Sequence, residues 1–227
     1  MKKLMIALAI VALASVAQAE VVASWTASGA INFNTMGTVA ATTSGYGFSM
    51  IAGSGFNGTT APAGATFSGA GATASSASAA YDTGEYLYFT WNNDYTLTLD
   101  SVTARYSRVA NGAKTAQWGI IDGGWTSIGS AASITATATP GTSYPGITTT
   151  FSSSGLKSGQ LGVAFFGGSG STATDWVRLD SRPSGTPVEA LSIEGTMVSV
   201  TPIPEPATMG LLGLGALALA LRRKLSK

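Results

Sequence analysis

Apolar residues recur at every second position over much of the stretch between residues 85 and 200, which is the pattern of β-strands with one buried face. In Tyr95–Leu99 the apolar residues occupy odd positions, whereas in Val102–Tyr106 they occupy even positions. Because side chains alternate strictly between the two faces of a strand, this change of parity predicts either a β-bulge near Asp100–Ser101 or two strands bent into one another there. A second change, from odd positions before Gly195 to even positions after it, predicts a bulge there.

Turn signals separate these segments into many short strands. Asn111–Gly112 is a hairpin signal, and Asn92–Asp94 and Asp122–Gly124 have the composition of tight turns. Apart from the segments around residues 95–106, strands are predicted at Val21–Trp25, Glu85–Trp91, Thr115–Ile121, Ser133–Thr139, Ile147–Ser152, Gln160–Gly167, Thr174–Asp180 and Val188–Val200. Glu85–Trp91 is apolar on both faces, which suits a strand buried on both sides. No stretch shows a helical period with capping residues, so the sequence predicts an all-β, antiparallel β-sandwich of jelly-roll-like form over residues 20–200.

The N-terminal segment has a different pattern. Lys2 and Lys3 precede a continuous apolar run, Leu4–Ala14, and Ala17 and Ala19 are small residues at the positions that a signal peptidase reads. This arrangement predicts a secretory signal peptide, residues 1–19, cleaved after Ala19. The mature chain would then begin outside the cytoplasmic membrane.

The C-terminal segment, residues 201–227, has three parts in a fixed order. Pro204, Glu205 and Pro206 come first, followed by 15 uncharged residues, Ala207–Leu221, and by a basic tail at residues 222–227. A proline is well placed at the start of a helix, and a helix of this length is about 22 Å long, short of the roughly 30 Å hydrocarbon core. Snorkelling side chains and local thinning make a single transmembrane helix feasible.

The basic cluster of this tail indicates its orientation. Arg222, Arg223 and Lys224 should remain on the cytoplasmic side, which leaves everything upstream outside.

This tripartite end resembles the PEP-CTERM sorting signal of Gram-negative bacteria. The resemblance covers about the last 25 residues and implies processing near Pro204–Pro206 by exosortase, a membrane transpeptidase, after signal peptidase has acted. It implies a chain that is anchored transiently in the inner membrane and is then sorted to the cell surface or the extracellular space. It further implies an association with exopolysaccharide, and hence with a biofilm or an extracellular matrix.

The charge and composition of residues 20–200, the body of the chain, limit the classes of partner and the kinds of stabilising bond that we expect. Six of the 12 lysines and arginines belong to the two end segments, as does one of the 11 acidic residues, so residues 20–200 carry a net charge near −4. A mildly acidic body gives no reason to expect nucleic acid as a partner. The chain has no cysteine, so no disulfide stabilises the body.

The absence of histidine and cysteine removes the common nucleophile triads and the imidazole or thiolate metal sites. Carboxylates remain, but none has a motif around it, so we expect no catalytic residue, no metal and no cofactor. The candidate carboxylates are Glu85, Asp100, Asp122, Asp175, Asp180, Glu189 and Glu194. Calcium at Asn92–Asp94 or at Asp175/Asp180 is a weaker interpretation than turn formation.

A softer resemblance concerns the body. The order of strands and turns from about Tyr86 to Thr196 looks like the passenger domain of other exported proteins, a sugar-binding-type jelly roll, and bears on the fold alone. Two functions stay open: a non-catalytic structural component of the surface or matrix, and a carbohydrate-binding module that binds extracellular polysaccharide. A glycoside hydrolase is a distant third. The carbohydrate-binding module would need an exposed row of aromatic rings. The candidates for such a row are Trp91, Trp118, Trp125 and Trp176.

Overall fold

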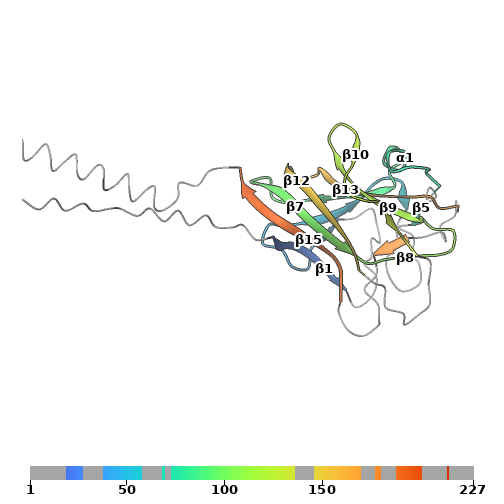
Figure 1. Cartoon of the computed structure of the whole chain (residues 1–227), viewed down its shortest axis with the longest axis horizontal. Helices are drawn as coiled ribbons and strands as arrows, with labels where there is room; N and C mark the ends of the chain where they lie inside the picture. The colour runs from blue at the N-terminus through green and yellow to red at the C-terminus, as the bar shows by residue number, and fades with distance from the viewer. Residues whose placement is uncertain are drawn as a thin grey trace, which may run out of the picture.

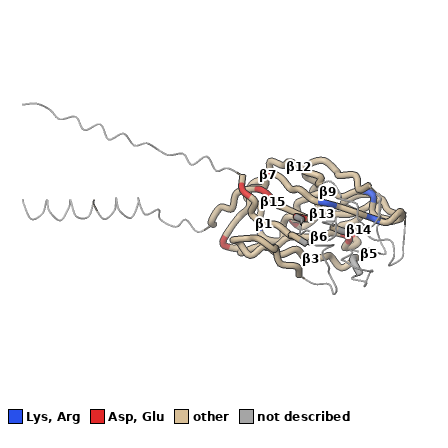
Figure 2. Tube along the Cα trace, turned by 90° about the horizontal axis from the view of Figure 1, so that it is seen from below, with Lys and Arg blue, Asp and Glu red and all other residues tan. Residues whose placement is uncertain are grey.

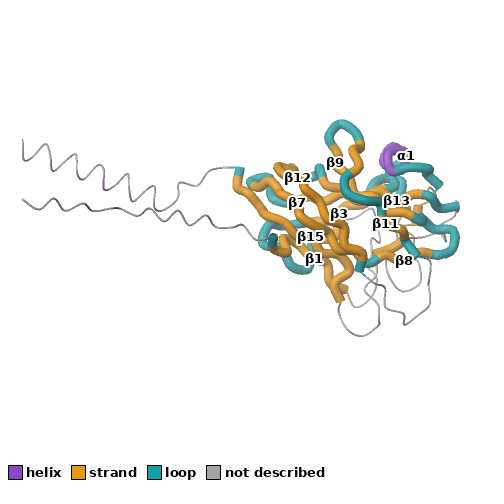
Figure 3. The backbone as a smooth tube through the Cα atoms, viewed as in Figure 1, coloured by secondary structure: helices purple, strands orange, loops and turns teal. Residues whose placement is uncertain are grey.

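The computed structural model describes residues 19–27, 38–57, 68–69, 73–135, 146–169, 177–179, 188–200 and 214. Within these ranges the chain forms antiparallel sheets with a single short helix, as Figures 1 and 3 show. The strands are β1 (Glu20–Ala27), β2 (Thr38–Ala40), β3 (Ser49–Ala52), β4 (Phe56–Asn57), β5 (Ser68–Gly69), β6 (Tyr86–Thr90), β7 (Tyr95–Ala104), β8 (Tyr106–Arg108), β9 (Thr115–Ile121), β10 (Trp125–Ser127), β11 (Ala132–Ser133), β12 (Ile147–Leu156), β13 (Leu161–Phe166), β14 (Val177–Leu179) and β15 (Val188–Ser199).

Two sheets face each other. The smaller has the order β1-β15-β7-β12, and the larger has the order β10-β9-β13-β6-β3-β2, with β11 also paired to β9. From β6 onward each long strand lies in the sheet opposite to the previous one, so the chain crosses repeatedly between the two sheets. Small ladders of β8 with β14 and of β4 with β5 complete the pairing. The prediction of antiparallel β-sheets with an alternating apolar face is therefore confirmed.

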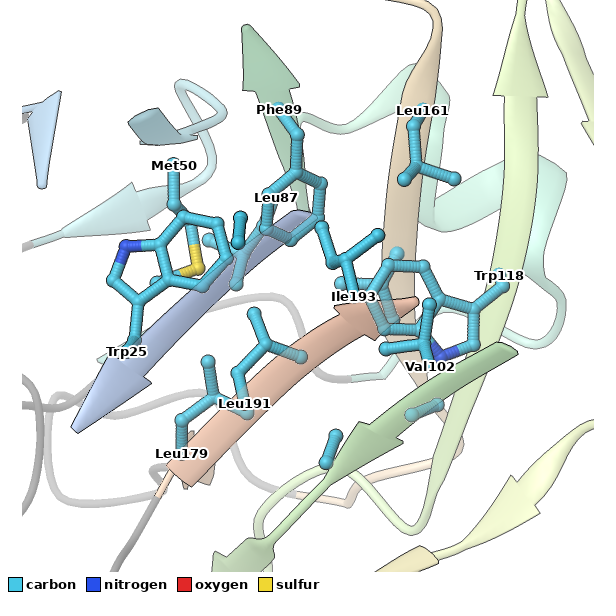
Figure 4. Packing of buried hydrophobic residues seen from close by; sticks show 14 of the residues in the cluster. Trp25, Met50, Leu87, Phe89, Val102, Trp118, Leu161, Leu179, Leu191 and Ile193 are labelled. Atoms are coloured by element: carbon cyan, nitrogen blue, oxygen red, sulfur yellow. The ribbon is translucent and has the colours of Figure 1, made fainter. Parts of the chain in front are cut away.

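The core lies between the two sheets. Side chains from both contribute to one apolar cluster, in which Trp25, Trp118, Phe89, Leu97 and Ile193 are almost completely buried. Figure 4 shows side chains of the two sheets meeting: Trp25 and Val102 come from the smaller sheet, and Met50, Phe89 and Trp118 come from the larger. Edge-to-face and stacked ring contacts, such as Trp25 with Phe89 at 5.5 Å between centroids, add directional packing to the burial.

The two predicted bulges are one feature of the β7–β15 pair. Leu99 lies opposite Gly195 and Ser101 opposite Glu194, so Asp100 is an extra residue on β7. The parity change on β7 is thereby explained. On β15 the predicted change of face is wrong, because Val198 and Val200 are 50% and 53% exposed.

Two other expectations are corrected. The body was expected to have no helix, but α1 (Ala77–Asp82) forms, with the Ser76 hydroxyl accepting the Ala79 N–H at 3.2 Å as an N-cap. Six residues are too few to display a helical period. Asn111–Gly112 does lie in a turn, closed by the Gly112 N–H on the Val109 carbonyl at 3.1 Å, but it does not make a hairpin. Both edges of β9 are occupied by other strands, and β8 pairs with β14 instead.

The strand predicted at Glu85–Trp91 is only half as buried as expected. Leu87 and Phe89 of β6 face the core, whereas Tyr86 and Tyr88 are half-buried on the outer face. β9 matches its prediction, and the bounds of β1, β13 and β15 agree within two residues. β12 begins where predicted but ends four residues later, and of the strand predicted at Ser133–Thr139 only Ser133 is in a strand among the described residues. Residues 136–139 of one predicted strand, and residues 174–176 and 180 of another, lie outside the described residues.

Candidate functional site

The predicted mature N-terminus coincides with the start of the first strand. Ala19 is exposed, and β1 begins at the next residue, Glu20, which pairs with Gly195 on β15. Ala17 lies outside the described residues. Removal of residues 1–19 would therefore leave every described strand whole.

The last strand ends just before the predicted sorting segment. β15 closes at Ser199, and the next residue, Val200, donates its N–H to the Asp94 carbonyl at 2.9 Å. Pro204, Glu205, Pro206, Arg222, Arg223 and Lys224 lie outside the described residues. Within the predicted helix Ala207–Leu221 only Leu214 is described, and it is helical and 66% exposed. None of the helices in the described part of the chain has the length and apolar character needed to cross a membrane.

The carboxylates of the body lie on different elements. Glu194 on β15 accepts a hydrogen bond from the Ser101 hydroxyl at 2.8 Å, Asp100 is the bulge residue, and Asp122 lies in the β9–β10 turn. Glu189 is exposed, whereas Glu85 is buried at the start of β6. Burial raises the pKa of the Glu85 carboxyl to about 7. Asp175 and Asp180 lie outside the described residues.

A metal site receives no support from the geometry of the described residues. These contain no group of three or more acidic side chains placed to hold an ion. The Asn92 side chain accepts the Asp94 N–H at 3.0 Å, which is the local hydrogen bond of an Asx turn. Asn92–Asp94 therefore forms the turn that its composition predicts.

The predicted aromatic row is divided between the core and the outside. Trp91 and Trp118 are buried between the sheets, with 4% and 1% of their surface exposed, so neither can stack on a ligand. Trp176 lies outside the described residues. Trp125 lies on the outer face of the larger sheet, half-buried, together with Tyr81 and Tyr86.

These outer rings attach the helix to the sheet. The Trp125 indole lies so close to Gly119 and Gly162 that a side chain at either position would meet it. Tyr81 of α1 packs on it with 5.9 Å between ring centroids, and Ala77 and Ala80 bury against the same cluster. Figure 3 shows α1 on the outside of the larger sheet. The cluster is a small second core rather than an open platform.

A hollow in the surface lies between the edge strand β12 and the loop that follows β10. It has a volume of about 410 Å³ and is lined by Ile128, Gly129, Thr150, Phe151, Ser152 and Ser153. A second hollow of about 180 Å³ shares Thr150 and continues along the strand; its other residues are Ser130, Ala131, Ala132, Ile147, Thr148 and Thr149. We call the two together the β12 groove. The sequence alone did not predict this groove, although the run of Thr and Ser around Phe151 is unusual for a strand.

Comparison with known proteins identifies the C-terminal segment. Residues 202–224 match the family model of the PEP-CTERM protein-sorting motif. The chain ends in a PEP-CTERM motif. The motif covers Pro204–Pro206, the apolar run and the basic cluster, and it implies export directed by exosortase to the cell surface or the extracellular space. No curated protein and no solved structure matches the chain.

Proposed function

We propose that the protein is an exported surface or extracellular-matrix component that signal peptidase and then exosortase process at its two ends. The observation that carries the proposal is the position of the PEP-CTERM motif, which begins at residue 202, directly after a β-sandwich whose last described strand ends at Ser199. A sorting signal that follows the last described strand can be removed without loss of any described strand.

The order of events follows from the two end segments. Residues 1–19 direct export and are cleaved after Ala19, and Ala207–Leu221 then holds the chain in the inner membrane as a transmembrane helix. Arg222, Arg223 and Lys224 keep the short tail on the cytoplasmic side. Pro204, Glu205 and Pro206 lie at the outer surface of the membrane, where exosortase recognises them.

The distance between the sandwich and this element is short. Three residues, 201–203, separate Val200 from Pro204, and an extended chain covers at most about 3.6 Å per residue. The sandwich therefore stands close to the membrane until the tail is cut. Release would change its location and leave its fold unchanged.

For the sandwich we propose a non-catalytic role beside exopolysaccharide in a biofilm or matrix, on a jelly-roll-like fold. Two observations support the non-catalytic part. The chain contains no histidine and no cysteine, and among the described carboxylates Glu194 accepts a hydrogen bond from the Ser101 hydroxyl. Its polar surface is built mainly from Ser and Thr, and Figure 2 shows few charged residues on the described sandwich.

Exosortase dependence can be tested by expressing the chain in a host with its exosortase and in the same host with that enzyme deleted. We expect the mature sandwich outside the cell in the first host and in the inner-membrane fraction in the second. The control is an exported protein without the motif, whose location should be the same in both hosts. Equal fractionation of our chain in the two hosts would refute the proposal.

A further inference from the structure

Exposed apolar side chains gather at one end of the described sandwich. Its exposed large apolar residues, among those that the structure describes, are Val21, Val198 and Val200, each with about half of its surface accessible. Val21 lies at the start of β1, whereas Val198 is near the end of β15 and Val200 follows that strand. Figure 1 shows where β15 ends, and the sorting motif begins at residue 202, only two residues after Val200.

The register of the smaller sheet places the three valines on one surface. Glu194, Val198 and Val200 are separated by even numbers of residues, so their side chains leave β15 on the same face. Val21 is directly opposite Glu194 and therefore shares that face. It is the outer face, because Ile193, at an alternate position, is buried in the core. We call Val21, Val198 and Val200 the valine patch.

Two tyrosines lie at the same end of the sandwich. Tyr95 is opposite Ser199, the last residue of β15, and Tyr46 packs edge-to-face on Tyr95 with 5.1 Å between ring centroids. The Tyr46 hydroxyl donates to the Glu20 carboxylate at 3.2 Å, and both rings are half-buried. Tyrosines with an apolar body and a polar tip are enriched where a protein meets the boundary between water and a bilayer.

The short chain between the valine patch and the sorting motif determines what the patch can face. Pro204 is four residues after Val200, so the two lie at most about 14 Å apart, and Val198 is about 7 Å further back along β15. With Pro204 at the outer surface of the membrane, both valines can reach the headgroup layer, which is roughly 5–8 Å thick on each side. The tether also keeps the patch at a high effective concentration near the bilayer, so a small apolar contact suffices.

The charges at this end indicate which kind of lipid surface fits. Glu20 and Asp94 are exposed there, with Lys157 at the end of β12 as a partial offset. Acidic groups are repelled by anionic headgroups, so attraction to anionic lipid cannot supply the contact. Apolar burial at zwitterionic headgroups remains as its source.

We propose that, until the tail is cut, the valine patch and the Tyr46–Tyr95 pair rest on the outer surface of the inner membrane. The contact gives the sandwich a fixed orientation, with the outer face of β15 toward the bilayer, and holds Pro204–Pro206 at a constant height for processing. This inference rests on the proposed function, because it requires the C-terminal tail to be a membrane anchor.

The test uses a fluorescent probe on a single cysteine, since the chain has none of its own. Val198→Cys, Leu214→Cys and Ser78→Cys are purified from the inner membrane of the host without exosortase, labelled, and reconstituted into phosphatidylcholine vesicles. Ser78 is the matched control, because it is exposed on α1, outside the larger sheet (Figure 3). Lipids that carry a nitroxide on the headgroup should quench the Val198 probe at least about threefold more than the Ser78 probe.

A charge in the valine patch should lift it from the membrane. We expect Val21→Glu/Val200→Glu to reduce headgroup quenching of the Val198 probe by at least about half. Thr148→Glu/Thr150→Glu adds the same charges at exposed positions on β12 and should leave the quenching unchanged. Equal unfolding midpoints of the variants exclude misfolding as the cause of a loss.

The Leu214 probe separates a failure of this inference from a failure of the proposed function. Nitroxides on the acyl chains should quench it when the tail is inserted. Quenching of Leu214 together with equal headgroup quenching of Val198 and Ser78 would overturn the membrane contact alone, whereas an unquenched Leu214 would overturn the anchor and the contact together.

Three further results would overturn the contact. One is headgroup quenching of the Val198 probe that Val21→Glu/Val200→Glu does not change. Another is quenching that rises when phosphatidylglycerol replaces part of the phosphatidylcholine, which would make the contact electrostatic. The third is disulfide cross-linking between unlabelled Val198→Cys chains without headgroup quenching of the probe, which would assign the valine patch to a second copy.

Discussion

Glu85 lies at the start of β6 with 3% of its surface exposed, and its Oε2 has no hydrogen-bond partner among the described residues. Burial is the main cause of its raised pKa, and the nearby Thr83 side chain offsets it in part. The folded state therefore favours the neutral carboxyl, whereas in the unfolded chain the pKa is near the ordinary value of 4.5. Ionising the Glu85 carboxyl therefore costs more free energy in the folded state than in the unfolded state.

This difference gives a pH dependence with a definite sign. Below about pH 4.5 the carboxyl is neutral in both states and there is no penalty, and the free energy of unfolding should fall as pH rises from about 4.5 to about 7. A shift of this size corresponds to roughly 3 kcal/mol above pH 7. Glu85→Gln should remove that decline and make the protein more stable than the wild type at pH 8, as measured by denaturant unfolding across the pH range.

Glu189→Gln is the matched control, because Glu189 is exposed. It should leave the pH profile close to that of the wild type. A wild-type profile that Glu85→Gln does not change would mean that the Glu85 carboxyl is solvated or paired.

At the scale of elements, the bulge in β7 keeps two apolar segments on one face. Leu97 and Leu99 precede Asp100 at odd positions, and Val102 and Ala104 follow at even positions, yet all four are buried. Without the extra residue, the strand would alternate regularly and present the same four side chains to the core. Deletion of Asp100 should therefore preserve the buried face.

Deletion of Thr98 is the contrasting change. It would place Leu97 next to Leu99, so that one leucine must leave the core at a cost of about 2–5 kcal/mol. We expect the Asp100 deletion to be less destabilising than the Thr98 deletion by at least about 2 kcal/mol in thermal or urea unfolding. Equal destabilisation by the two deletions would contradict the assigned register.

The strands were predictable where burial alone determines the pattern. Thr115–Ile121 matches β9, and the parity change at Asp100 correctly located the bulge. Features that depend on distant partners were not predictable. The pairing of β8 with β14 and the exposure of Val198 result from which strands meet, and local alternation does not encode that.

A candidate site could be recognised from the sequence only where its residues are contiguous. The sorting motif is contiguous, so Pro204–Pro206 and the basic cluster could be recognised directly. The β12 groove combines Phe151 with Gly129 and with Gln117, which come from separate segments. Of the three candidate tryptophans that the structure describes, two, Trp91 and Trp118, are core residues, because residue type alone does not tell a buried ring from an exposed one.

At the scale of the whole molecule, the predicted signal peptide and the sorting motif adjoin the same end of the sandwich. Glu20 pairs with Gly195, and β15 runs only four residues further, to Ser199. The β1–β15 pairing thus joins the first and the last described strands, and β15 ends before the sorting motif begins at residue 202. Cleavage at both ends should yield a folded sandwich.

The most direct test of this account is the intact mass and cell fraction of the native protein, compared with a Pro204→Ala/Glu205→Ala/Pro206→Ala variant in a host that has exosortase. We predict that the native form lacks residues 1–19 and the C-terminal tail and is found outside the cell. The variant should lack residues 1–19, keep its tail and remain in the inner membrane. If both proteins keep the tail and fractionate alike, the segment is only an anchor and the sorting function is wrong.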